Sequence, residues 1–185
     1  MRTISIFEQV SLDGFYASAT DDPWYHAQRA DPEFVEFISA NASGDGELLF
    51  GRKTYDQMAA FWPSAEAARA MPAVAKGMNA KRKLVASRSM QSAAWQHTQV
   101  IGGDLIASVR ELKARAGEPI VVLGSGTIVA QLAEADLIDE YQLLVIPVVL
   151  GAGRTLFEGT TRRIELALAS SRSFRNGCVF GVYRR

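Results

Sequence analysis

Short apolar runs alternate with amphipathic helical patterns along most of the chain, and this alternation most constrains the fold. The runs have the length of buried strands, and helices are expected between most of them. The expected strands are 4–10, 47–50, 83–87, 99–101, 119–123 and 138–149, and the expected helices are 32–42, 53–60, 104–116 and 127–135. Strands joined by crossover helices run parallel, with right-handed connections. The order therefore predicts an α/β domain with three layers and a mixed, mostly parallel central sheet.

The last part of the chain has no helical pattern. Residues 164–174 and 178–184 are predicted to be two strands joined by Arg175-Asn176-Gly177, a tight-turn sequence. Without a crossover helix this pair forms an antiparallel hairpin at the C-terminal side of the sheet. Residues 64–80 are rich in Ala and Met, and both a loop and a loosely packed helix fit that composition.

Length and composition narrow the class of protein. The chain has 185 residues, of which 48% are apolar and 22% charged, so we expect one globular domain over residues 1–185. Lys and Arg together number 20, as do Asp and Glu, so the chain lacks the basic excess of nucleic-acid-binding proteins. No apolar run approaches the roughly 18 residues of a membrane span. We therefore expect a cytoplasmic protein with neither nucleic acid nor membrane as partner.

The cysteine and histidine content gives little support to a metal site or a disulfide. Cys178 is the single cysteine, and the histidines are His26 and His97. One cysteine cannot make an intrachain disulfide, and this set is too small for the common zinc sites. We expect no metal centre.

A glycine-rich turn joins an apolar strand to a helix at Gly124-Ser125-Gly126-Thr127. Glycines let the backbone approach a phosphate closely, and the helix start offers free N–H groups. A tight turn that holds no ligand fits the same residues. Both alternatives stay open on this motif alone.

Two further strand ends carry groups that can bind an anion. Gly51-Arg52-Lys53-Thr54 places two cations at a helix start, where they oppose the helix dipole unless an anion is bound. Ser87-Arg88-Ser89 offers hydroxyl and guanidinium donors to a phosphomonoester. Solvated side chains at a turn and a polar loop are the alternatives. Together the three strand ends suit one long ligand with several phosphates.

These motifs, in this order, resemble the dihydrofolate reductase superfamily. Gly51-Arg52-Lys53-Thr54-Tyr55 is similar to its Gly-Arg-Lys/His-Thr-aromatic signature. The segments Ser11-Leu12-Asp13-Gly14 and Pro147-Val148-Val149-Leu150-Gly151-Ala152-Gly153 are closer to a sister group. That group is the reductase domain of bifunctional riboflavin-biosynthesis deaminase–reductases and its stand-alone homologues.

The resemblance implies a dihydrofolate reductase-like fold, NADPH as cofactor and a homodimer. Ser87, Arg88 and Ser89 would bind the 2′-phosphate, and Gly124, Ser125 and Gly126 would meet the pyrophosphate and nicotinamide side. The chain departs from both groups. Val35 stands near the acid of the first helix in dihydrofolate reductases, and Gly124 stands where riboflavin-pathway reductases usually have Glu.

Candidates for the substrate side lie in loops. Asp13 is the candidate catalytic residue, as a proton donor or substrate contact, and a turn residue is its alternative. Phe15 and Tyr16 follow it, and Trp24 and Trp62 lie in aromatic clusters that would stack on a flat heterocycle. Packing of these loops on the body fits them equally. His26 is a possible proton donor, although a solvated loop histidine is the commoner case.

The leading hypothesis is an NADPH-dependent oxidoreductase that transfers a hydride to a small heterocyclic or carbonyl/imine compound. One alternative is the riboflavin-pathway reductase that acts on 5-amino-6-(5-phosphoribosylamino)uracil. Its phosphate would need a further cation, for which Arg154 and Lys81 are candidates. The second alternative is a non-catalytic nucleotide-binding domain.

Overall fold

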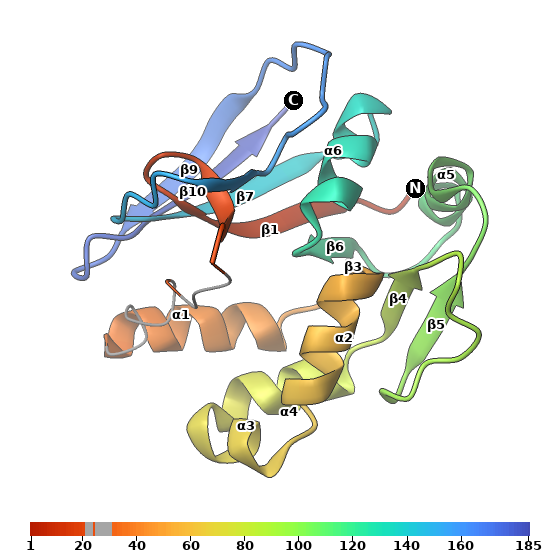
Figure 1. Ribbon diagram of the computed structural model, residues 1–185, viewed down its shortest axis with the longest axis horizontal. Coiled ribbons are helices and arrows are strands. Elements are labelled where there is room, and N and C mark those ends of the chain that lie inside the picture. The colour runs from red at the N-terminus through yellow and green to blue at the C-terminus, as the bar shows by residue number, and fades with distance from the viewer. Residues whose placement is uncertain (21–23, 25–30) are drawn as a thin grey trace.

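The computed structural model describes residues 1–20, 24 and 31–185, and its centre is an eight-stranded sheet (Figure 1). The strand order is β5-β4-β3-β6-β1-β7-β10-β9. In that order the strands are Thr98–Ile101, Lys83–Ala86, Glu47–Gly51, Ile120–Leu123, Ile4–Ser11, Glu140–Ile146, Val179–Arg184 and Ala167–Ser173. The first six run parallel to one another, β10 pairs antiparallel with β7, and β9 pairs antiparallel with β10. The predicted mixed sheet with a C-terminal hairpin is confirmed.

Helices cover both faces of the sheet and complete the three layers (Figure 1). On one face α5 and α6 pack against alternate residues of β1 such as Ile4 and Ile6. On the other face α1 packs near β7 and β10, and α2, α3 and α4 pack on β3 and β4. The helices α1 to α6 are Pro32–Ser43, Arg52–Phe61, Ala65–Ala70, Pro72–Ala80, Leu105–Ala114 and Gly126–Glu134.

Several boundaries differ from the sequence prediction. Residues 64–80 form the two short helices α3 and α4, and the Ser64 hydroxyl caps the first by accepting from the Ala67 N–H. The expected strand over 138–149 ends at Ile146, directly before Pro147, which has no N–H for a ladder. A two-stranded sheet of β2 (Phe15–Ser18) and β8 (Gly153–Thr155) was not predicted, because neither strand shows an apolar alternation.

The strand register opens a gap in the middle of the sheet. The pairing of β6 with β1 ends at Phe7 and Leu123, whereas β1 continues beside β7 as far as Ser11. The residues of β1 after Phe7 therefore have a strand neighbour on one side only. Gly124 and the start of α6 follow directly on the other side. In parallel sheets such points beyond the carboxyl ends of the strands are where ligands bind.

No helix in the described part of the chain has the length and apolar character that crossing a membrane requires.

Candidate active site

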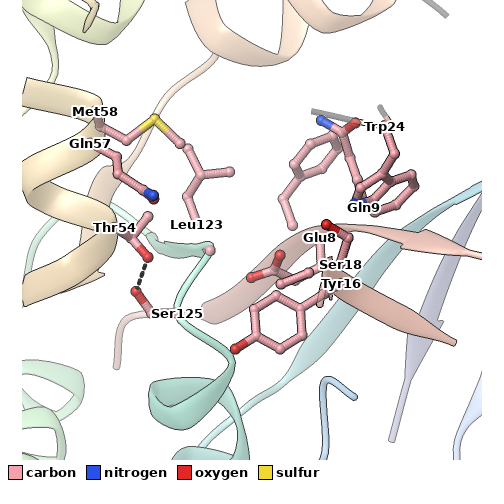
Figure 2. Close-up of a pocket in the computed structure, with 13 residues that line it drawn as sticks. Glu8, Gln9, Tyr16, Ser18, Trp24, Thr54, Gln57, Met58, Leu123 and Ser125 are labelled. Atoms are coloured by element: carbon pink, nitrogen blue, oxygen red, sulfur yellow. Dashed lines mark hydrogen bonds between the residues drawn. The ribbon is translucent and has the colours of Figure 1, made fainter. Parts of the chain in front are cut away.

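Two adjoining pockets lie at the carboxyl ends of the strands. The central pocket, with a cavity of about 250 Å³, is drawn in Figure 2. The cationic pocket beside it is smaller, at about 160 Å³. The central pocket is lined by Phe7, Glu8, Gln9, Tyr16, Ala17, Ser18, Trp24, Thr54, Gln57, Met58, Leu123, Gly124 and Ser125. The cationic pocket is lined by Tyr16, Ala17, Gly51, Arg52, Lys53, Thr54, Gln57, Ser125, Gly126, Thr127 and Arg154. The shared residues make the two one continuous cleft.

Two helices begin in the cationic pocket without a side-chain cap. The side chains of Asp31, Ser64 and Asp104 cap other helices, but the N-cap residues of α2 and α6, Gly51 and Ser125, provide no side-chain cap. Their first N–H groups carry partial positive charge and have no partner within the helix. The side chains of Arg52, Lys53 and Arg154 line the same pocket. The arrangement is that of an anion site.

Ser125 joins the two strand ends that carry these helices. Its hydroxyl accepts a hydrogen bond from the Gly51 N–H at 2.7 Å and donates to Thr54 Oγ1 at 2.8 Å, a contact seen in Figure 2. Ser125 also adopts a left-handed conformation with φ 71°, which is uncommon outside glycine. The Ser125 hydroxyl, predicted to bind the cofactor, is thus engaged within the protein and positions the cleft.

The two glycines of this turn allow close approach of side chains as well as of a ligand. A Cβ at Gly124 would lie 2.6 Å from Thr54 Cγ2, and one at Gly126 would lie 2.5 Å from Tyr16 Cε1. The Tyr16 ring therefore packs directly on the start of α6, at the boundary of the two pockets. The two interpretations of this motif, a tightly packed turn and a turn that lets a ligand approach the backbone, are therefore compatible.

The third predicted strand end lies beside the cleft. Arg52 Nη1 donates to Ser89 Oγ at 3.5 Å, while its Nε pairs with Asp56 at 2.8 Å. The Ser87 hydroxyl accepts from the backbone N–H groups of Ser89 and Met90, which shapes a turn. The side chain of Arg88 is exposed. The structure thus brings 87–89 next to Arg52 but outside the residues that line the two pockets.

Glu8 is a functional candidate that the sequence reasoning missed. It lines the central pocket and is only 5% exposed, and its Oε1 has no hydrogen-bond partner among the described residues. Burial raises the pKa of Glu8 to about 8 from an ordinary 4.5, against the opposing effect of a hydrogen bond from the Gly124 backbone. The signal was visible, because Glu8 falls in phase with the buried Ile4, Ile6 and Val10 of β1.

Asp13, the predicted catalytic residue, holds the loop at Leu150 and Gly151 by hydrogen bonds. Its carboxylate accepts hydrogen bonds from the Ser11 hydroxyl at 2.6 Å and from the N–H groups of Leu150 and Gly151 at 3.1 and 2.8 Å. The Ser11 hydrogen bond and these backbone donors lower the pKa of Asp13 to about 2. A carboxyl group held ionised in this way is a poor proton donor at neutral pH, and its partners give it a positioning role.

The predicted aromatic contacts separate into two groups. Tyr16 and Trp24 line the central pocket (Figure 2). Phe15 does not line it, and Trp62 is 8% exposed within the core formed with α2 and α4, where its Nε1 donates to Met58 Sδ at 3.0 Å. The structure does not bring Trp62 to the cleft. Tyr25 and His26 lie outside the described residues.

The part of the chain that the structure describes contains no group of three His, Cys, Asp or Glu side chains that could hold a metal ion.

Comparison with known proteins places this chain in a family. The fold is that of an α/β protein of the dihydrofolate reductase-like class. The model of the RibD C-terminal domain matches residues 2–180, and the chain belongs to this family of reductase domains.

Individual relatives agree with that assignment. The uncharacterised protein YyaP of Bacillus subtilis (strain 168) is 29% identical over 182 residues, covering 98% of this chain and 94% of YyaP. YwjB of the same organism is 34% identical over 79 residues, which are 43% of this chain and 45% of YwjB. The crystal structure of a candidate riboflavin biosynthesis protein from Shewanella sp. PV-4 superposes with a TM-score of 0.73 at 22% identity. It covers 99% of this chain and 98% of that one, and it supports the fold.

Proposed function

We propose that this protein is an NADPH-dependent reductase of a small heterocyclic or carbonyl/imine compound. The observation that carries the proposal is the cationic pocket, where two uncapped helix starts and three cationic side chains converge. A multiply phosphorylated cofactor suits this donor set, because its phosphates would satisfy N–H groups that lack side-chain caps. Membership of a reductase-type family supports the same conclusion.

Different residues along the cleft would bind different parts of the cofactor and the substrate. Arg52, Lys53 and Thr127 would hold phosphate groups, and Gly124 and Gly126 would allow the ligand to approach the backbone. When bound, the reduced cofactor supplies a hydride. Tyr16 and Trp24 would hold a flat substrate in the central pocket and exclude water from it. The catalytic role predicted for Asp13 gains no support from its hydrogen bonds, and we do not include it.

Reduction of 5-amino-6-(5-phosphoribosylamino)uracil in riboflavin biosynthesis remains the more specific alternative. The family and the Shewanella structure favour it. The substrate phosphate would need a cation that the cofactor leaves free. Arg154 suits this role because it lines the cleft and lies 5.5 Å from the centre of the Tyr16 ring. Lys81 does not suit it, because it lies outside both pockets and donates to the Gly44 carbonyl oxygen.

The first test is titration of the purified protein with NADPH and NADH, followed by tryptophan quenching and energy transfer to the reduced nicotinamide. Arg52→Ala is expected to weaken NADPH binding roughly 10- to 100-fold, the effect of one charge-assisted contact. Arg88→Ala is expected to weaken NADPH but not NADH, if Arg88 binds the 2′-phosphate. The exposed Arg110 on α5 provides the matched control, Arg110→Ala.

The outcomes separate the candidate functions. Failure of NADPH to bind at high-micromolar concentration would overturn the proposed function. Tight binding justifies a screen for NADPH oxidation with dihydrofolate, the ribosylaminopyrimidine phosphate and simple carbonyls and imines. Binding without oxidation by any of them would favour the non-catalytic nucleotide-binding alternative. A cytoplasmic location and a homodimer remain predictions.

A further inference from the structure

Glu8 is a buried acid for which folding offers no explanation. A buried carboxyl group with an unpartnered oxygen costs free energy, so it persists only where something compensates or where it has a task. Glu47 in the same sheet is equally buried at 5% exposed, but Arg2 pairs with it at 3.0 Å and Arg82 at 3.3 Å. No described cation forms a salt bridge with Glu8. Among the described residues, only the Gly124 backbone thus offers Glu8 a hydrogen bond, and one oxygen is left for a ligand.

The surroundings of Glu8 show where such a partner would lie. Figure 2 shows its carboxyl group within the central pocket, between Tyr16 and the end of β6. Gly124, whose backbone hydrogen-bonds it, is the first residue of the turn that leads into the cationic pocket. Tyr16 is the described titratable side chain that interacts electrostatically with Glu8. The charges of Arg154, in β8, and of Glu158, which follows β8, also act on Tyr16. A cofactor held by its phosphates at the start of α6 would extend its ring end toward Glu8.

We propose that Glu8 is the catalytic acid and that its charge alternates with that of the nicotinamide ring. This inference rests on the proposed function. Glu8 is neutral beside the uncharged reduced ring and holds a proton ready for the substrate. It is ionised beside the oxidised ring, because that ring carries a positive charge and no cation in the described part of the chain pairs with Glu8. An acid on β1 thus takes the place of the one for which Val35 stands in the first helix.

The proton and electron balance closes with this assignment. The substrate C=X carbon, where X is oxygen or nitrogen, accepts the hydride, and the X atom accepts the proton from the Glu8 carboxyl group. A C–H and an X–H bond form as the C=X π bond breaks. The substrate is reduced and NADPH is oxidised to NADP⁺. Glu8 is left as a carboxylate and regains a proton from water when NADP⁺ departs.

Asp13 and Glu8 have opposite environments, which separates their roles. Asp13 is exposed and accepts three kinds of hydrogen bond, so its carboxylate is stabilised. Glu8 is enclosed with one oxygen unpartnered, so its neutral form is stabilised. Pairs of carboxyl groups whose pKa values are shifted in opposite directions by their environments are typical of enzymes that need a proton donor at neutral pH. Of the two acids, Glu8 is the one that lines the central pocket.

The test uses NADP⁺ and NADPH as probes and needs no substrate. In weakly buffered solution at pH 7, binding of NADP⁺ to the intact protein is expected to release close to one proton more than binding of NADPH. Both nucleotides carry the same phosphates, so proton changes at the phosphates cancel in the difference. Glu8→Gln is expected to bind NADPH and to lose that difference. Glu66→Gln, which removes an exposed acid on α3, is expected to keep it.

Equal proton release with the two nucleotides in the wild-type protein would overturn the inference while leaving the proposed function intact. Persistence of the difference in Glu8→Gln would also overturn it. If neither nucleotide binds, the proposed function fails, and this inference fails with it.

Infrared difference spectra of the wild-type protein give a second readout that does not depend on a folded variant. A protonated-carboxyl band is expected with NADPH and should be lost with NADP⁺. An unchanged band would contradict the assignment.

Discussion

At the scale of single residues, the cleft is defined by how each polar side chain is satisfied. Ser125 accepts from Gly51 and donates to Thr54, so its hydroxyl is fully used within the protein. Glu8 is the exception in the described part of the cleft, with a buried oxygen that no hydrogen bond satisfies. Such an exception reduces stability, and enzymes commonly trade stability for function at sites of this kind.

The cost of Glu8 should appear as a pH-dependent stability. The folded state holds its pKa near 8, whereas the unfolded value is about 4.5. The unfolded chain therefore releases the proton first, and the contribution of Glu8 to stability is present below pH 4.5 and is lost as the pH rises to 8. Glu8→Gln removes this pH-dependent loss of stability, because the amide side chain does not ionise. Relative to wild type, the variant should gain roughly 2 to 4 kcal/mol in free energy of unfolding between pH 5 and pH 8.

Urea unfolding of both proteins at the two pH values measures this gain. A difference between variant and wild type that is independent of pH would show that the pKa of Glu8 is not raised.

At the scale of elements, the ends of helices separate structural from functional positions. The helices with side-chain caps, α1, α3 and α5, begin away from the cleft. The two that begin in the cationic pocket, α2 and α6, lack such caps. Away from the cleft α4 also lacks one, but its first residue is Pro72, which has no N–H to be capped. Capping residues contribute about 1 kcal/mol each, so their omission at both helices leaves N–H groups for a ligand. The strand-to-helix turns at Gly51 and Gly124 thus serve as the binding elements.

The packing of α1 on α4 depends on Gly77. A Cβ at this position would lie 2.4 Å from the carbonyl oxygen of Ala42, a backbone atom that cannot turn aside. Gly77→Ala is expected to force the two helices apart and to lower the free energy of unfolding by about 2 kcal/mol, despite the better helix propensity of alanine. Chemical denaturation provides the measurement. Ala73→Val, at an exposed position of α4, is the control, and an equal loss there would contradict the packing argument.

At the scale of the whole molecule, one edge of the sheet is uncovered. Every residue of the edge strand β9 is exposed. Leu168 near its start is 57% exposed, and Val179 at the start of the adjacent strand β10 is 41% exposed. Uncovered apolar edge strands invite pairing with another chain. The structure therefore supports the homodimer as a prediction, with its interface at the C-terminal hairpin.

Charge at this edge should separate the protomers. Leu168→Asp is expected to shift the protein from dimer to monomer in sedimentation equilibrium, because an interface cannot easily bury an unpaired carboxylate. Leu12→Asp places the same charge at an exposed leucine of the β1–β2 turn and is expected to remain dimeric. A monomeric wild-type protein would contradict the prediction.

Local sequence patterns predicted the strands of the eight-stranded sheet and four of the six helices, in their order. The helix expected over residues 32–42 is α1 in the structure, and the glycines at 51 and 124 marked strand ends that adjoin one cleft. These features are local, because caps, turns and apolar periodicity act over a few residues. The resemblance of the motifs then led to the family that the comparison shows.

Only the tertiary structure decided which polar and aromatic residues belong to the site. The pKa of Asp13 is lowered by Ser11 nearby and also by the N–H groups of Leu150 and Gly151, far along the chain. The pKa of Glu8 is raised by the residues that bury it in the gap beyond β6. Trp24 lines the pocket and Trp62 the core, although both lie in aromatic clusters of the sequence. Burial and partners depend on residues distant in sequence, and no local pattern encodes them.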